Sequence, residues 1–359
     1  MAVTKITNVK IFDGEKLSEQ RSVVIKDGVI SSKTIADITI DGEGCTLLPG
    51  FIDSHIHLDS LKNLEDATDW GITTMLDMAT NSKDVVESLR NLDGLTDIRS
   101  VYEPVAPESH PHLMGMGFKD SKIHTIEDAE NFAKKQIKQG ADFVKIIIED
   151  PKTSKTAFDF ETIKRVVEIS HEHGKKVFAH APTTIAYEYA EKANVDVINH
   201  IPFIGKLSED VAKRIKEKNL ISIPTIVMME SIISNIKKAT GREDVRLEKA
   251  IENTATLKKA GVMILAGTDA NNDKNSVSIV KHGESLHREF ELLVKAGLNT
   301  IEVLESATSL PAKLLGLNDR GVIREGKRAD LVMVEGDPIK NIVATRNIKG
   351  VWIKGNKVR

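Results

Sequence analysis

Between residues 51 and 269 the chain alternates between short apolar runs typical of strands and amphipathic stretches typical of helices. The expected strands cover residues 51–57, 72–78, 98–105, 143–148, 176–180, 195–200, 220–225 and 262–269. Several of the intervening helices end at a glycine, the residue that most readily caps a helix at its carboxyl end. Eight strand–helix units predict an α/β fold, a (β/α)8 TIM barrel with its active site at the carboxyl ends of the strands.

A doubly wound open sheet is the structural alternative to the barrel. Its dinucleotide-binding version is excluded because no G-x-G-x-x-G sequence follows the first expected strand. After the eighth strand we expect one helix over residues 286–296 and another over residues 300–315.

Both ends of the chain have a different pattern, rich in β-branched residues. Residues 1–46 form short strand-like runs separated by turn signals such as Asp13-Gly14 and Asp27-Gly28. Strand-like runs return from Gly321 onward. Neither end is long enough to form a stable domain alone. We therefore expect one small composite β-sandwich built from residues 1–48 and 319–359, with the barrel at residues 49–318.

Composition narrows the functional classes. The 359 residues include 50 Lys and Arg against 53 Asp and Glu, so no basic surplus favours nucleic acid. A single cysteine, Cys45, excludes an intrachain disulfide framework. No apolar run approaches the roughly 18–20 residues of a membrane helix, and the amino terminus lacks a signal-peptide core. We therefore expect a cytoplasmic protein with a small-molecule substrate, no nucleic acid and no membrane contact; a homo-oligomer stays open, since barrel helices often form subunit contacts.

Polar residues stand at the ends of the otherwise apolar strands. His55 and His57 share one face of the first strand, because side chains two residues apart point the same way. Neutral imidazoles bind zinc at about 2.0–2.1 Å. Further polar residues end or lie in later strands: Lys145 in the fourth, His180 in the fifth, His200 in the sixth and Asp269 in the eighth. Each alone could cap a strand or reach solvent, but together they predict a metal site at the barrel mouth.

The sequence LLPGFIDSHIHLDS, residues 47–60, resembles the signature of the amidohydrolase superfamily. GITTMLDMA and GTDA resemble that family's second and eighth strands, and residues 285–338 resemble its imidazolonepropionase-like and Xaa-Pro-dipeptidase-like branch. The resemblance covers nearly the whole chain and is weaker between about residues 81 and 140. It implies a TIM barrel with a composite β-sandwich.

The resemblance also implies roles for the residues at the strand ends. It makes His55, His57, His180, His200 and Asp269 metal ligands. Lys145 resembles a fourth-strand lysine that members with two metals carry as a carbamate. An ammonium group cannot be a ligand, whereas a carbamate offers two anionic oxygens that can bridge two cations. The sequence departs from the branch after Lys145, where IIIEDP replaces small residues and glycines, so a bridged zinc pair and a single zinc both stay open.

The expected reaction is hydrolysis of an amide, peptide-like or cyclic amide C–N bond. One or two Zn²⁺ would lower the pKa of a bound water toward ~7. Asp269 would take the proton of that water and pass it to the leaving nitrogen.

Two alternatives remain beside this hydrolase. Deaminases of the superfamily often carry a glutamate shortly after the strand-five histidine, whereas Ala-Pro-Thr-Thr follows His180 here. A non-catalytic scaffold on this fold should lack one or more ligands, and all of them are present.

Substrate contacts are less well defined by the sequence. His110, in Ser109-His110-Pro111-His112, falls where the branch carries a GGHG-like segment, although a surface loop histidine is the alternative. We interpret His282-Gly283 as lid or loop structure. Tyr102, Lys119 and Arg242 are candidates to meet a substrate carboxylate.

Overall fold

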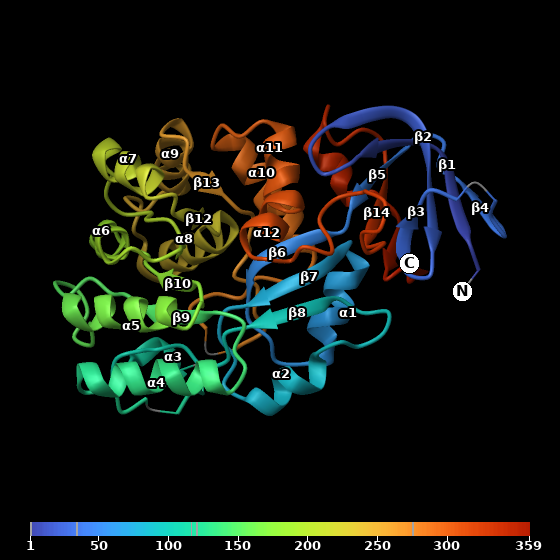
Figure 1. The fold of residues 1–359 in the computed structure, drawn as a ribbon. Coiled ribbons are helices and arrows are strands. Elements are labelled where there is room, and N and C mark those ends of the chain that lie inside the picture. Colours follow the sequence, from blue (N-terminus) through green and yellow to red (C-terminus); the bar gives the residue numbers. More distant parts are fainter. Residues whose placement is uncertain (1, 34, 116, 120, 275) are drawn as a thin grey trace.

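A computed structural model describes residues 2–33, 35–115, 117–119, 121–274 and 276–359 of the chain, without the side chains of Gln20 and His112. It has a barrel of strands wrapped by helices, with a β domain packed at one side (Figure 1). Within these residues no helix is both long and apolar enough to cross a membrane.

The barrel wall consists of two all-parallel sheets. The strands are β6 (Phe51–Ile56), β7 (Ile72–Asp77), β8 (Asp97–Ser100), β9 (Val144–Ile147), β10 (Val177–His180), β11 (Val197–Asn199), β12 (Ile221–Ile223) and β13 (Met263–Ile264). Their orders are β6-β7-β8 and β13-β12-β11-β10-β9. Parallel bridges from Val105 to Ile146 and from Ile56 to Ala270 join the two sheets at both seams. The predicted TIM barrel is confirmed, with strands shorter than expected.

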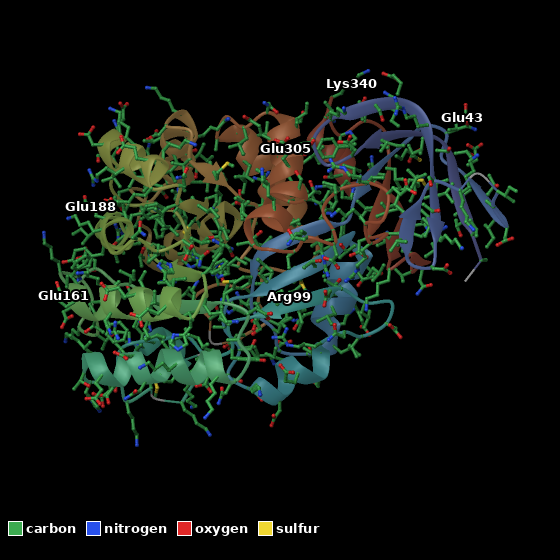
Figure 2. The ribbon with its side chains drawn as sticks, viewed as in Figure 1. Glu43, Arg99, Glu161, Glu188, Glu305 and Lys340 are labelled. Atoms are coloured by element: carbon green, nitrogen blue, oxygen red, sulfur yellow. The ribbon has the colours of Figure 1, made fainter. Side chains whose placement is uncertain are left out.

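Helices cover the outside of the wall. They are α1 (Leu61–Asp69), α2 (Lys83–Leu89), α3 (Pro111–Gly115), α4 (Ile126–Lys138), α5 (Phe160–Glu172), α6 (Thr184–Ala193), α7 (Glu209–Glu217), α8 (Ile226–Thr240), α9 (Leu247–Lys259), α10 (Glu284–Lys295), α11 (Thr300–Ser306) and α12 (Ser309–Leu314). Side-chain caps such as Thr125, Asp159 and Ser208 accept the first free backbone N–H groups of their helices. Polar residues such as Glu161 and Glu188 lie at the molecular edge (Figure 2).

The helix expected over residues 300–315 is divided into α11 and α12. The break falls at Ala307 and Thr308, and Pro311 lies in the first turn of α12, where its missing N–H costs no hydrogen bond. The break turns α12 toward the barrel axis, so that Ala312, Leu315 and Leu317 pack with inward-facing strand residues such as Phe178. The bottom of the barrel is thereby filled with apolar side chains, which leaves the opposite end for polar chemistry.

The β domain is built from both ends of the chain, as predicted. Its strands are β1 (Thr4–Phe12), β2 (Leu17–Lys26), β3 (Val29–Ser31), β4 (Ile38–Asp41), β5 (Cys45–Pro49), β14 (Leu331–Glu335), β15 (Ile348–Ile353) and β16 (Asn356–Lys357), with a 3-10 turn at Ile342–Arg346. They form one mixed sheet in the order β16-β15-β14-β5-β1-β2-β3, and β4 pairs with β1. Both chain ends therefore lie in this sheet (Figure 1). The limits at residues 48/49 and 318/319 stay a prediction.

A buried ionic cluster joins the bottom of the barrel to the β domain. Asp97, at the start of β8, lies 2.7 Å from the Arg320 guanidinium and 3.3 Å from that of Arg328. Arg328 in turn pairs with Asp330, just before β14, at 2.7 Å. All four side chains are at most 10% exposed, so each charge depends on its partners for compensation.

We expect Arg320→Ala to lower the free energy of unfolding by about 3–5 kcal/mol, because it removes one partner of a buried charge pair. Arg242→Ala is the matched control, since Arg242 pairs with Asp244 on the exposed surface and its loss should cost at most about 1 kcal/mol. Chemical denaturation followed by circular dichroism measures both. Equal stabilities of the two variants would contradict a structural role for the cluster.

Candidate metal centre

An irregularity in β6 aims His55 at the barrel mouth. Ile52 faces the barrel interior, so strict alternation would also turn Ile56 inward. Instead, the register of β6 against β7 shifts between Asp53 and Ile56, and Ile56 packs in the outer layer between strands and helices. An extra residue of this kind reverses which side chains face inward. His55 consequently points into the mouth from a strand whose alternation predicts the opposite.

Backbone conformation at the ends of other strands is also unusual. His200, Thr225 and Asp269 follow β11, β12 and β13 with φ values of 72°, 47° and 60°. Positive φ is uncommon for residues other than glycine and costs most for a β-branched residue such as Thr225. Three such residues at one end of the barrel indicate that the surrounding packing holds the mouth in a fixed geometry.

His55, His200 and Asp269 bring ligand atoms within 4.8 Å of one another, a group that can hold a metal ion. Asp269 Oδ1 lies 3.3 Å from His55 Nε2 and 2.9 Å from His57 Nε2. Two atoms bound to one tetrahedral zinc at 2.0–2.1 Å are about 3.3 Å apart. The His180 ring lies 4.5 Å from that of His200, between centroids. The donor set and its spacing therefore fit a bound metal ion.

Several buried polar atoms at this site have no hydrogen bond. Among the described residues these include both ring nitrogens of His55 and Nζ of Lys145. Such atoms are costly unless a partner is supplied. Burial, followed by the charge of Lys145, lowers the pKa of His55 to about 3, so its ring is neutral as a ligand must be.

The pKa values of Lys145 and Asp269 are both lowered, with opposite effects on charge: the lysine is partly neutral and the aspartate is ionised. Burial lowers the pKa of Lys145 to about 7, although the nearby Asp269 acts against this shift. Burial would raise the pKa of Asp269, but His55, His57 and His200 hold it well below its usual range. At neutral pH the site thus contains an anionic carboxylate and an amine that is partly uncharged.

Supporting contacts come from residues that the sequence analysis did not single out. Thr225 Oγ1 lies 3.0 Å from His200 Nδ1, and the carbonyl oxygen of Ala79 lies 2.8 Å from His57 Nδ1. Each contact leaves Nε2 of its ring for a ligand. Asp53 accepts hydrogen bonds from the backbone N–H of His55 and from Thr268. Asp53 lies in the motif at residues 47–60 and Thr268 in GTDA, residues 267–270, whereas Thr225 lies in no recognised motif.

The remaining histidine candidates lie beside the site. His282 Nε2 is 2.9 Å from the carbonyl oxygen of His57, which agrees with loop support as its role. His110 reaches the site through Glu149, whose Oε1 is 3.2 Å from His110 Nε2 and 3.6 Å from His180 Nε2. Burial would raise the pKa of Glu149, but His110 and then His180 hold it well below its usual range.

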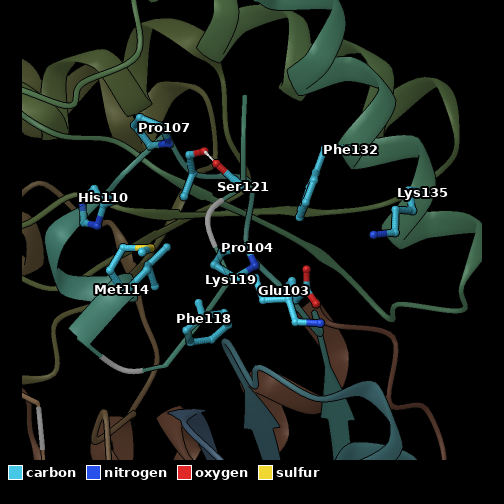
Figure 3. A pocket seen from close by; sticks show the side chains of 12 residues that line it. Glu103, Pro104, Pro107, His110, Met114, Phe118, Lys119, Ser121, Phe132 and Lys135 are labelled. Atoms are coloured by element: carbon cyan, nitrogen blue, oxygen red, sulfur yellow. Dashed lines mark hydrogen bonds between the residues drawn. The ribbon is translucent and has the colours of Figure 1, made fainter. Parts of the chain in front are cut away.

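The three candidates for a substrate carboxylate are separated by the structure. Tyr102 is buried and donates to Glu87 at 2.5 Å, and Arg242 pairs with Asp244. Lys119 lines a cavity of about 310 Å³ that His110 also lines (Figure 3). Lys119 thus shares a cavity with His110, and none of the candidate metal ligands is among the residues that line this cavity.

Two further cavities meet at His57. One, of about 70 Å³, is lined by His57, His180, His200 and Asp269 together with apolar residues, namely Phe203, Met229, Ile232 and Val277. The second, of about 450 Å³, is lined by polar residues such as Asp59, Asn81 and Lys274 and by apolar ones such as Leu58, Val85 and Phe118. Most of the candidate ligands therefore border a small, partly apolar cavity, with a larger cavity of mixed lining beside it.

Comparison with known proteins shows which family this chain belongs to. The model of the amidohydrolase family matches residues 46–358. An uncharacterized protein of Mycobacterium bovis is 24% identical over 88% of this chain and 85% of its own length. A 5'-deoxyadenosine deaminase of Methanopyrus kandleri is 22% identical over 88% and 82%. Among solved structures, a Xaa-Pro dipeptidase with bound methionine has TM-score 0.83, 24% identity and 99% coverage of both chains. Ochratoxinase of Aspergillus niger has TM-score 0.80, 20% identity and coverage of 100% and 96%.

The fold and the site together define a metal-dependent hydrolase that acts on C–N bonds. The chain belongs to the amidohydrolase family, because the family model spans most of its length. The predictions of enzyme class and family are thereby confirmed. Zinc, a carboxylated lysine, a cytoplasmic location and a homo-oligomer stay predictions.

We expect Thr225→Val to weaken metal binding by about 10- to 100-fold, because the hydroxyl group that orients His200 is lost at nearly constant volume. Thr225→Ser keeps the hydroxyl group and should bind metal within about threefold of the original protein. Competition titration with a chromophoric chelator measures both affinities. A valine variant that binds metal as tightly as the serine variant would show that Thr225 does not orient His200.

Proposed function

We propose that this protein hydrolyses an amide, peptide-like or cyclic amide bond of a small molecule, with Asp269 as the group that moves the proton. The observation that carries the proposal is the meeting of the candidate ligands His55, His200 and Asp269 at a buried site, where the His55 ring nitrogens make no hydrogen bond. A buried site of this kind needs cations to compensate its polar atoms.

The proposed ligands fall into two sets. His55, His57 and Asp269 would hold an inner zinc, and His180 and His200 an outer one. Nitrogen and carboxylate donors at these separations suit Zn²⁺. Bound zinc would supply a water of lowered pKa and a Lewis acid toward the substrate carbonyl.

Lys145 is proposed as the bridge between the two sets, in carbamate form. Its pKa of about 7 leaves a substantial fraction as neutral amine near neutral pH. The amine nitrogen can then bond to the carbon of CO₂ and release one proton, giving an anionic group with two oxygens. Lys145 is only 3% exposed, so burial would protect the carbamate from exchange with bulk water.

Asp269 is suited to proton transfer. Its side chain is 13% exposed, so it borders the small cavity and also contacts the imidazoles. Because its pKa is held well below the usual range, it is a carboxylate at neutral pH and can accept a proton from the attacking water. It would then give this proton to the leaving nitrogen.

The apolar residues of the small cavity point to the substrate class. Phe203, Met229, Ile232 and Val277 line the same cavity as His57, His180, His200 and Asp269, so an apolar group next to the cleaved bond would gain from burial there. We propose amides with an aliphatic or aromatic substituent, and Xaa-Pro dipeptides are the first set to examine in view of the similar dipeptidase structure.

Deamination is the second candidate, and one observation favours it. Glu149, two residues after β9, lies 3.6 Å from His180. A carboxylate therefore stands beside His180 even though no glutamate follows this histidine in the sequence. A 5'-deoxyadenosine deaminase is also among the relatives. Ammonia release from amino-substituted heterocycles distinguishes this reaction from amide hydrolysis.

We expect protein purified without chelator to contain at least one equivalent of transition metal and to hydrolyse members of a panel of dipeptides, N-acyl amino acids and lactams. Chelation should abolish turnover and zinc should restore it. Asp269→Asn should lower kcat by about 10²- to 10⁴-fold, the usual contribution of a general base, with an unchanged circular dichroism spectrum. Metal-free protein with full activity, or an active Asp269→Asn variant, would contradict the proposal.

Lys145→Ala should reduce metal content from two equivalents per chain to one or fewer, because the bridging anion is lost. Lys119→Ala is the control, since Lys119 is an exposed lysine. Mass spectrometry of metal content after gel filtration measures the difference. Two equivalents retained in Lys145→Ala would exclude the bridge.

A further inference from the structure

Glu149 lies at the mouth of the barrel, directly after β9, where the sequence departs from the pattern of its family branch. Its side chain is 18% exposed, and its Oε1 contacts His110 and His180. No ion pair with a lysine or arginine is found for it among the described residues. A carboxylate so far buried needs a compensating charge, and imidazoles alone provide one only when protonated.

The two contacts of Glu149 differ in kind. His110 Nε2 is 3.2 Å from Oε1 and can donate a hydrogen bond to it. His180 Nε2 is 3.6 Å away, which is long for a hydrogen bond. It is close to the separation of about 3.3 Å expected for a nitrogen and an oxygen bound to one tetrahedral zinc. The His180 ring also lies 4.5 Å from that of His200, between centroids, so His180 contacts both Glu149 and His200.

We propose that Glu149 is a further ligand of the metal held by His180 and His200. This inference rests on the proposed function, which supplies that metal. The carboxylate adds a negative charge to the outer half of the site whether or not Lys145 is a carbamate. Through its contact with His110, Glu149 also links the metal to the loop that carries His110. Metal binding would therefore affect the position of this loop, which lines the cavity in Figure 3.

The test compares Glu149→Gln with Glu103→Gln. Glu103 lines the same cavity as His110, and no contact with a histidine is found for it among the described residues, so it is a matched carboxylate away from the metal (Figure 3). We expect Glu149→Gln to bind the weaker equivalent of zinc at least 10-fold less tightly in chelator competition. We also expect a changed visible spectrum of the Co²⁺-substituted protein. Glu103→Gln should match the original protein in both measurements.

The variant His110→Asn distinguishes two roles of Glu149, as a metal ligand or only as a hydrogen-bond partner of His110. If Glu149 binds the metal, this variant keeps zinc affinity within about threefold and keeps the Co²⁺ spectrum. A loss equal to that of Glu149→Gln would place the effect in the His110 contact and overturn the proposal. Unchanged affinity and an unchanged Co²⁺ spectrum in Glu149→Gln would also overturn it, while leaving the proposed function intact. Original protein that binds no transition metal would overturn the proposed function itself.

Discussion

The carbonyl oxygen of His55 accepts the backbone N–H groups of Thr268 and Asp269, at 3.2 and 2.7 Å. This pair of hydrogen bonds joins the first barrel strand to the residues after the last one. It depends on the irregularity of β6, which turns both the carbonyl and the imidazole of His55 to new directions. The same hydrogen bonds therefore close the barrel and bring the candidate ligands His55 and Asp269 together. A change that breaks this seam would disturb the candidate site before it unfolds the helices outside.

The charges of the mouth follow from its burial. Burial keeps the imidazoles of His55 and His200 neutral and partly discharges Lys145, while the surrounding histidines keep Asp269 ionised. The candidate ligands His55, His200 and Asp269 are thus in the protonation states that metal binding needs. The ring nitrogens of His55 and the amine of Lys145 make no hydrogen bond, which is costly for buried polar atoms. The opposite end of the barrel is filled by apolar residues around α12 and fixed to the β domain by the Asp97 and Arg320 pair.

Much of the fold was predictable because its signals are local. The alternation of apolar runs and amphipathic helices predicted the barrel, and the matching β texture of the two ends predicted the shared sheet. The division of the helix at residues 300–315 was missed, since the proline effect at Pro311 depends on where the first turn of α12 begins. For the candidate site, the sequence named the residues at the strand ends, but Thr225 was not among them. A threonine after a strand is common, and its contact with His200 arises only when β11 and β12 are adjacent.

The number and order of strand–helix units, and the residue types at their ends, were predictable because periodicity and residue chemistry are properties of short segments. How those ends meet was not predictable in this way. The fold turns His55 inward against the alternation of its strand, and it brings Glu149, in the segment after β9, beside His180 at the end of β10. In both cases the side-chain direction, at a bulge or in a loop, is fixed by packing and hydrogen bonds with residues far away in the chain. The spacing of residues along the sequence does not predict those contacts.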